Sequence, residues 1–115
     1  MKKIFLLAVL AVFLNGCDSH TYDDVIGYTS TPTYNQNIKK IMDNNCVSCH
    51  QSSYQGDNAG LYLTNYAEVQ DATINGSVAC RVDASCGNIM PVAGKMPAPI
   101  VKMIQIWKAN GCPEN

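Results

Sequence analysis

The sequence has no cluster of basic residues, no internal repeat and no low-complexity segment. Its 8 Lys and Arg residues are scattered among 9 Asp and Glu residues, so the formal net charge is −1 and nothing suggests nucleic-acid binding. Trp and Phe are scarce as well, with 1 Trp and 2 Phe among 115 residues, although there are 6 Tyr. The chain therefore has few bulky side chains from which to build a core.

The one long apolar run, from Ile4 to Leu14, is too short to cross a bilayer as a mature helix. It follows a pair of lysines, and this order is typical of a secretory signal peptide. The run leads into the motif LNGC, which ends at Cys17 and resembles the lipobox of bacterial lipoproteins. We predict a signal peptide over residues 1–16 and a lipid on Cys17 that anchors the protein in the bacterial cell envelope, on the periplasmic side or in the outer membrane. The alternative is an ordinary secretory signal with an incidental cysteine.

Residues 17–34 form a polar, threonine-rich stretch without a helical period. We predict that the lipidated cysteine is followed by a flexible tether with a reach of about 20–25 Å, in which His20 is a solvated loop residue. Residues 35–115 then form one domain of 81 residues. A chain of this size lies near the lower limit at which a polypeptide core alone is stable, so we expect a cofactor to complete the core.

The segment Cys46-Val47-Ser48-Cys49-His50 carries the clearest chemical information. C-x-x-C-H is the spacing at which two thiols bond covalently to haem and the next residue ligates its iron. We predict one covalent haem c, held by Cys46 and Cys49, with His50 as an axial iron ligand whose second N–H donates to an acceptor such as a backbone carbonyl. A thioredoxin-like redox pair, half of a zinc site and a chance match are the alternatives. A multihaem protein is excluded because the motif occurs once.

Apolar residues recur at helical spacing in two segments, one leading into the cysteine motif and one near the C-terminus. They are Ile38, Ile41 and Met42, and then Ile100, Met103, Ile104 and Trp107. Asn65 and Glu68 have the spacing of a capping box and predict a further helix after an extended segment that contains Leu61 and Leu63. Thr64 is the other possible cap. We expect three to four helices with little or no sheet, and Trp107 packing the last helix against the first.

The order of amphipathic helix, C-x-x-C-H, Leu-x-Leu-Thr-Asn-Tyr, Met-Pro loop and terminal helix resembles the small single-domain cytochrome c family of bacterial lipoproteins. The resemblance covers Tyr34 to Asn115. It implies an all-α, cytochrome c-like fold of three to four helices wrapped around one covalently attached haem. It also implies a membrane-anchored monomer that is not an enzyme and carries electrons by outer-sphere transfer between respiratory or other redox partner proteins. The alternative is a haem-based sensor or peroxidase with an open or displaceable sixth ligand.

In this family a methionine thioether from a loop before the last helix occupies the iron face opposite histidine. Met90 and Met96 are both followed by proline, which fixes the loop. The family order of Met-Pro, a glycine-containing turn and a hydrophobic residue fits if Met90 is the axial ligand, and Met96 is the alternative. Met42 and Met103 lie on the helical stripes and are expected in the core.

Three cysteines remain after two are assigned to haem and one to lipid, so one thiol stays free whatever the pairing. We predict a disulfide between Cys80 and Cys86, which would stiffen the loop that presents Met90. A pairing of either cysteine with Cys112 is the alternative. For Arg81 two roles remain open: a hydrogen bond to a haem propionate, or a solvated position on the surface.

Overall fold

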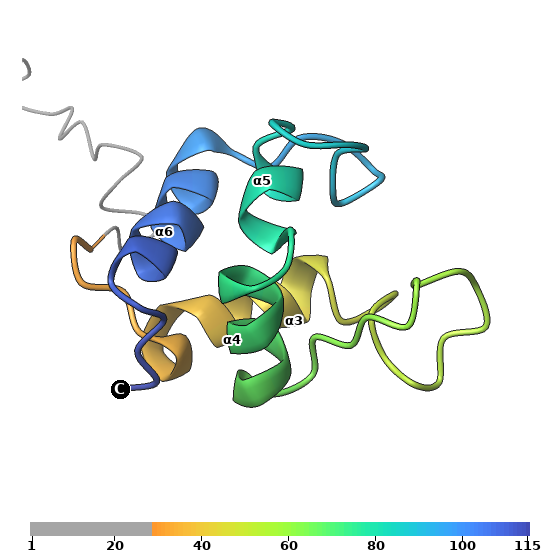
Figure 1. Ribbon diagram of the computed structural model, residues 1–115, viewed down its shortest axis with the longest axis horizontal. Helices are drawn as coiled ribbons and strands as arrows, with labels where there is room; N and C mark the ends of the chain where they lie inside the picture. Colours follow the sequence, from red (N-terminus) through yellow and green to blue (C-terminus); the bar gives the residue numbers. More distant parts are fainter. Residues whose placement is uncertain (1–28) are drawn as a thin grey trace, which may run out of the picture.

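The structure is a computed structural model and describes residues 29–115. The elements of this part of the chain are the π-helical turn η1 (Tyr34–Ile38) and the α-helices α3 (Lys39–Asn45), α4 (Tyr66–Ile74), α5 (Val78–Val82) and α6 (Ala98–Ala109). They surround a common interior, and the two long loops, after α3 and after α5, extend on the same side (Figure 1). Residues 29–115 contain no β-strand, and the predicted all-α fold is confirmed.

Some of the predicted features lie outside the described residues. These are the signal peptide of residues 1–16, the lipid site Cys17, and the part of the tether that contains His20. Within residues 29–115, no helix is long and apolar enough to cross a membrane.

The first helical segment runs without a break from η1 into α3 and on to the cysteine motif. Thr33 caps its start, because its side-chain oxygen accepts the Gln36 N–H at 3.4 Å. Ile38 and Met42 are fully buried, as their spacing predicted. The N–H of Cys46 donates to the Met42 carbonyl at 2.8 Å, so the helix leads directly into the motif.

The folded domain begins earlier than the predicted boundary at residue 35. Pro32 and Tyr34 are buried, although the tether of residues 17–34 was expected to include both. The N–H of Tyr34 donates to the Pro113 carbonyl at 2.9 Å, and the indole N–H of Trp107 donates to the same carbonyl at 2.9 Å. Our tether prediction extends too far because these bonds join the two ends of the domain and have no local sequence signal.

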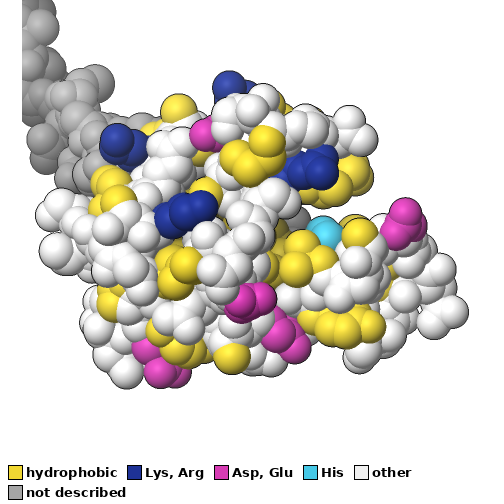
Figure 2. Space-filling view, viewed as in Figure 1, with side chains coloured by type: hydrophobic (Ala, Val, Ile, Leu, Met, Phe, Trp, Pro, Cys, Tyr) yellow, Lys and Arg dark blue, Asp and Glu magenta, His cyan; other side chains and the backbone are white. Residues whose placement is uncertain are grey.

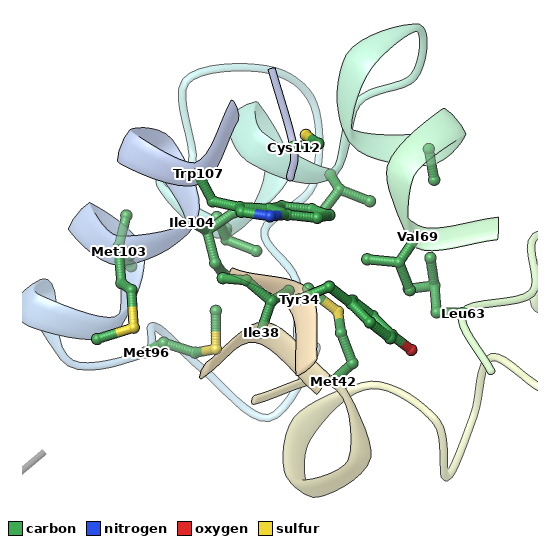
Figure 3. Close-up of a cluster of buried hydrophobic side chains, with 14 residues drawn as sticks. Tyr34, Ile38, Met42, Leu63, Val69, Met96, Met103, Ile104, Trp107 and Cys112 are labelled. Atoms are coloured by element: carbon green, nitrogen blue, oxygen red, sulfur yellow. The ribbon is translucent and has the colours of Figure 1, made fainter. Parts of the chain in front are cut away.

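Trp107 joins the last helix to the first in the centre of the core. Its side chain is fully buried, and its ring centroid lies 6.3 Å from that of Tyr34. Figure 3 shows the indole of Trp107 next to Tyr34, with Ile38 and Ile104 beside them. The two rings are tilted by 35° relative to each other. Removing a buried aromatic side chain of this size typically costs about 3–5 kcal/mol of stability. The prediction that Trp107 packs α6 against the first helix agrees with this arrangement.

Helix α4 begins with a variant of the expected capping box. The Asn65 side chain accepts the Glu68 N–H at 3.1 Å, as its spacing predicted. The Glu68 carboxylate, however, accepts from the Thr64 N–H at 2.8 Å and from the Thr64 hydroxyl at 2.7 Å. The box therefore also ties down the end of the extended Leu61–Leu63 segment that precedes it.

Candidate haem-binding site

A cavity of about 450 Å³ opens on the side where the two long loops lie. Figure 2 shows the hollow in this face, where hydrophobic side chains and a histidine reach the surface. Its volume is typical of small-molecule and cofactor sites. The predicted site residues Cys46, Cys49, His50 and Met90 all line it. The structure thus brings Met90 to the same cavity as the cysteine motif, which lies 40 to 44 positions earlier in the sequence.

The cysteine motif forms a turn at the end of α3. The N–H groups of Cys49 and His50 both donate to the Cys46 carbonyl, at 3.1 and 2.9 Å. This turn places the two cysteines and the histidine on one wall of the cavity. Both cysteines are free thiols, as covalent attachment to a vinyl group requires.

The Cys46 thiol does not have the properties of a redox-active thiol. Burial, and secondarily the neighbouring Cys49, raises the pKa of Cys46 to about 11. Reactive thiols of C-x-x-C redox proteins have lowered pKa values, because the thiolate is the nucleophile. The pKa of Cys46 therefore disfavours the thioredoxin-like alternative. Within residues 29–115, no group of three or more His, Cys, Asp or Glu side chains is placed to hold a metal ion.

His50 is held by hydrogen bonds to the extended segment that contains Leu61 and Leu63. Its Nδ1 lies 3.1 Å from the Leu61 carbonyl oxygen, and the N–H of Leu63 donates to the His50 carbonyl at 3.0 Å. A proton on Nδ1 donates to Leu61, which leaves the lone pair of Nε2 for a metal. Leu63 is buried in the core, so the segment that orients the imidazole is itself anchored.

The second long loop starts at α5, a helix that we had not located from the sequence. α5 has no side-chain cap, but Val78 and Val82 bury it against the core. A disulfide joins Cys80 to Cys86, with their Cα atoms 5.3 Å apart. This is the pairing we predicted, and Cys112 is a buried free thiol whose pKa is raised by burial.

Met90 and Met96 occupy different environments. Met90 is partly exposed and lines the cavity, and no other methionine is among its lining residues. Met96 is buried in the hydrophobic core together with Met42 and Met103 (Figure 3). Iron ligation by Met90 stays a prediction, and the placement of the two side chains favours it over Met96.

Two features of the site have no signal in the sequence. The acceptor for His50 is the backbone carbonyl of Leu61, and any residue type at that position could supply it. Arg81 lines the cavity, but its guanidinium also donates to the Asn88 carbonyl at 3.0 Å. Neither role that we considered for Arg81 includes this second contact.

The residues of the cavity fit a covalent haem. Two thiols for the covalent bonds and an imidazole with one nitrogen left to accept a metal lie on one wall, and a thioether lies elsewhere on the lining. Apolar groups, among them Leu61, Leu63, Val78 and Val82, make up much of the rest of the lining. An apolar surface with a few placed ligands is what a large, flat, mostly apolar cofactor requires.

Comparison with known proteins gives one match. The family model described as Cytochrome c matches residues 36–108, which is well over half of the chain and includes the cysteine motif and Met90. No curated protein and no solved structure matches.

Proposed function

The chain belongs to the cytochrome c family, and we propose that it carries electrons between redox partner proteins while anchored to a membrane by a lipid on Cys17. Covalent haem c as the cofactor and haem-based electron transfer as the general function follow from the family. The membrane anchor, the axial ligands and the kind of partner are the parts that we propose here.

One observation carries the proposed ligation: His50 and Met90 line the same cavity, and separate backbone contacts hold each of them. In our proposal Cys46 and Cys49 hold the macrocycle, and His50 and Met90 ligate the iron. Haem iron supplies reversible one-electron chemistry, and a methionine ligand raises its potential. With ligands on both faces no iron position is open to a substrate, which favours an electron carrier over an enzyme.

The anchoring of both ligands suits a carrier. The Leu61 carbonyl orients the imidazole of His50, and the Arg81 carbonyl accepts the N–H of Met90 at 3.0 Å. Ligands held by the backbone of a packed domain change position little when the charge of the site changes. We therefore expect the same ligands in both oxidation states.

The lipid anchor is supported by the order of sequence features before the domain. A lysine pair, an apolar run from Ile4 to Leu14 and the motif LNGC ending at Cys17 follow one another as in a lipoprotein signal. A lipidated Cys17 would keep the domain on the periplasmic side of a membrane or at the outer membrane, where encounters with membrane-bound redox partners are frequent. We propose this location, and a monomeric state, for the protein.

Visible spectroscopy of the holoprotein tests the ligation. We expect a covalent, low-spin haem whose ferric form shows the weak thioether band at the red end of the visible range. A high-spin haem that binds carbon monoxide at once would contradict the carrier and support a sensor or peroxidase.

Growth with labelled fatty acid tests the anchor. The wild type should be labelled and recovered with membranes, whereas Cys17→Ser should be unlabelled and released with an unchanged haem spectrum. A Cys17→Ser variant that remains in the membrane fraction would show that the apolar run has a different role.

A further inference from the structure

We propose that Arg81 is a positioning residue, which holds the end of the loop after α5 so that Met90 faces the cavity. The proposal rests on the ligation proposed above, with Met90 as the axial ligand. It concerns how this chain presents that ligand.

Arg81 contacts the loop at two points with two different groups. Its backbone carbonyl accepts the Met90 N–H at 3.0 Å. Its guanidinium donates from Nη1 to the Asn88 carbonyl, also at 3.0 Å. Because Arg81 belongs to α5, which Val78 and Val82 bury in the core, both contacts tie the loop to a fixed element.

The disulfide does not replace these contacts. The Cys80–Cys86 bond closes the beginning of the loop and ends before Asn88 and Met90. Within the described residues, the hydrogen bonds that join residues 87–90 to the rest of the chain both end on Arg81. Without the Arg81 guanidinium, the bond from the Met90 N–H to the backbone carbonyl of residue 81 would be the one hydrogen bond left between residues 87–90 and the rest of the described chain.

Gly87 gives independent support. Its φ is +55°, and a Cβ at this position would contact the guanidinium of Arg81. A residue without a side chain therefore lets the loop pass close over the guanidinium. The close approach shows that the loop is packed on the Arg81 side chain.

The first test replaces Arg81 by Leu, which has no donor, and by Lys, which keeps the charge and one donor group. Imidazole binding to the ferric holoprotein measures how easily the thioether leaves, and amide hydrogen exchange of residues 86–90 measures how firmly the loop is held. Loss of a charge-assisted hydrogen bond should raise imidazole affinity roughly tenfold in Arg81→Leu. Arg81→Lys should lie between this variant and the wild type. Lys102→Leu, an exposed change on α6, should alter neither measurement.

A second variant keeps Arg81 and its charge. Gly87→Ala should displace the guanidinium, raise imidazole affinity and speed exchange in residues 86–90. Gly111→Ala is its matched control, because Gly111 also has a positive φ, +81°, but a Cβ there would meet nothing within 4 Å. Backbone strain is thus introduced in both variants, and contact with Arg81 in only one.

The outcomes separate this proposal from the proposed ligation. A wild type without the thioether band would overturn both. A wild type with the band, but unchanged imidazole affinity in Arg81→Leu and Gly87→Ala, would overturn the positioning role alone. An altered reduction potential in Arg81→Leu, with unchanged amide exchange and imidazole affinity, would also overturn the positioning role. It would show that Arg81 acts on the haem through its charge alone.

Discussion

The two loops that flank the cavity hold their proposed iron ligands, His50 and Met90, in different ways. His50 directly follows the cysteine motif at the end of α3, and backbone bonds to Leu61 and Leu63 orient it. Met90 lies several residues past the end of α5, and a disulfide together with Arg81 ties its loop to that helix. His50 is thus held by its sequence neighbours and by the extended segment at Leu61 and Leu63, and Met90 by a few specific contacts of its loop.

This difference predicts that substitutions disturb the positions of His50 and Met90 to unequal extents. Covalent bonds from Cys46 and Cys49 would keep the macrocycle close to His50 whatever happens elsewhere. Met90 has no such bond, so its position depends on the contacts of its own loop. We therefore expect the methionine side to be where ligation is lost first, and the following predictions test that expectation from the largest effect to the smallest.

The largest effect is expected when both haem cysteines are replaced by Ala. The variant should carry no covalent haem and should lack a cooperative unfolding transition, because the domain is too small to close its core without the cofactor. Haem staining after denaturing electrophoresis and circular dichroism measure the two effects. Ser48→Ala, at an exposed position within the motif, is the control. A folded, protease-resistant apoprotein would contradict the prediction.

Replacing the two loop methionines should separate ligation from packing. Met90→Ala should abolish the thioether band and open the sixth iron position. Met96→Ala should keep the band but lower stability by about 2–5 kcal/mol, because Met96 is buried in the core. Spectra and denaturant unfolding give both quantities. If Met96→Ala alone removes the band, the two assignments must be exchanged.

Removing the disulfide should affect the methionine side selectively. Cys80 and Cys86 are 6 positions apart, and closing so short a ring stabilises a fold by about 2 kcal/mol. The double Ser variant should lose this amount and show faster amide exchange in residues 83–90, while exchange around His50 changes little. Equal acceleration of amide exchange in both loops would show that the two loops do not respond independently to loss of the disulfide.

The smallest effect concerns pH and the histidine side. Hydrogen bonds from the Thr64 side chain and backbone lower the pKa of Glu68, which caps the segment behind His50. The stabilisation is complete above the ordinary pKa of a glutamate, near 4.5, and is lost as the pH falls through the lower folded value. Because Glu68 is partly exposed to solvent, we expect less than about 1 kcal/mol. Glu68→Gln should remove this part of the pH dependence, which unfolding at several pH values measures. If stability depends on pH in Glu68→Gln as it does in the wild type, the prediction is wrong.

The comparison of the loops also shows where sequence reasoning works. The cysteine motif, the Asn65 cap and the stripe ending at Trp107 were recognisable because each depends on residues within one or two helical turns. Helix α5 was missed, since five residues are too few to show a period. Tyr34 was assigned to the tether because its partners, Trp107 and Pro113, lie at the other end of the chain.

The sequence by itself determined the cofactor and the class of fold. Haem attachment needs particular side chains at a fixed short spacing, and helices need a short apolar period. Both can therefore be predicted from short stretches of sequence. Only the tertiary structure decided which methionine lines the cavity, which carbonyl orients His50 and what Arg81 holds. These depend on backbone groups that every residue carries and on contacts between distant segments, which become specific only when the chain packs around its core.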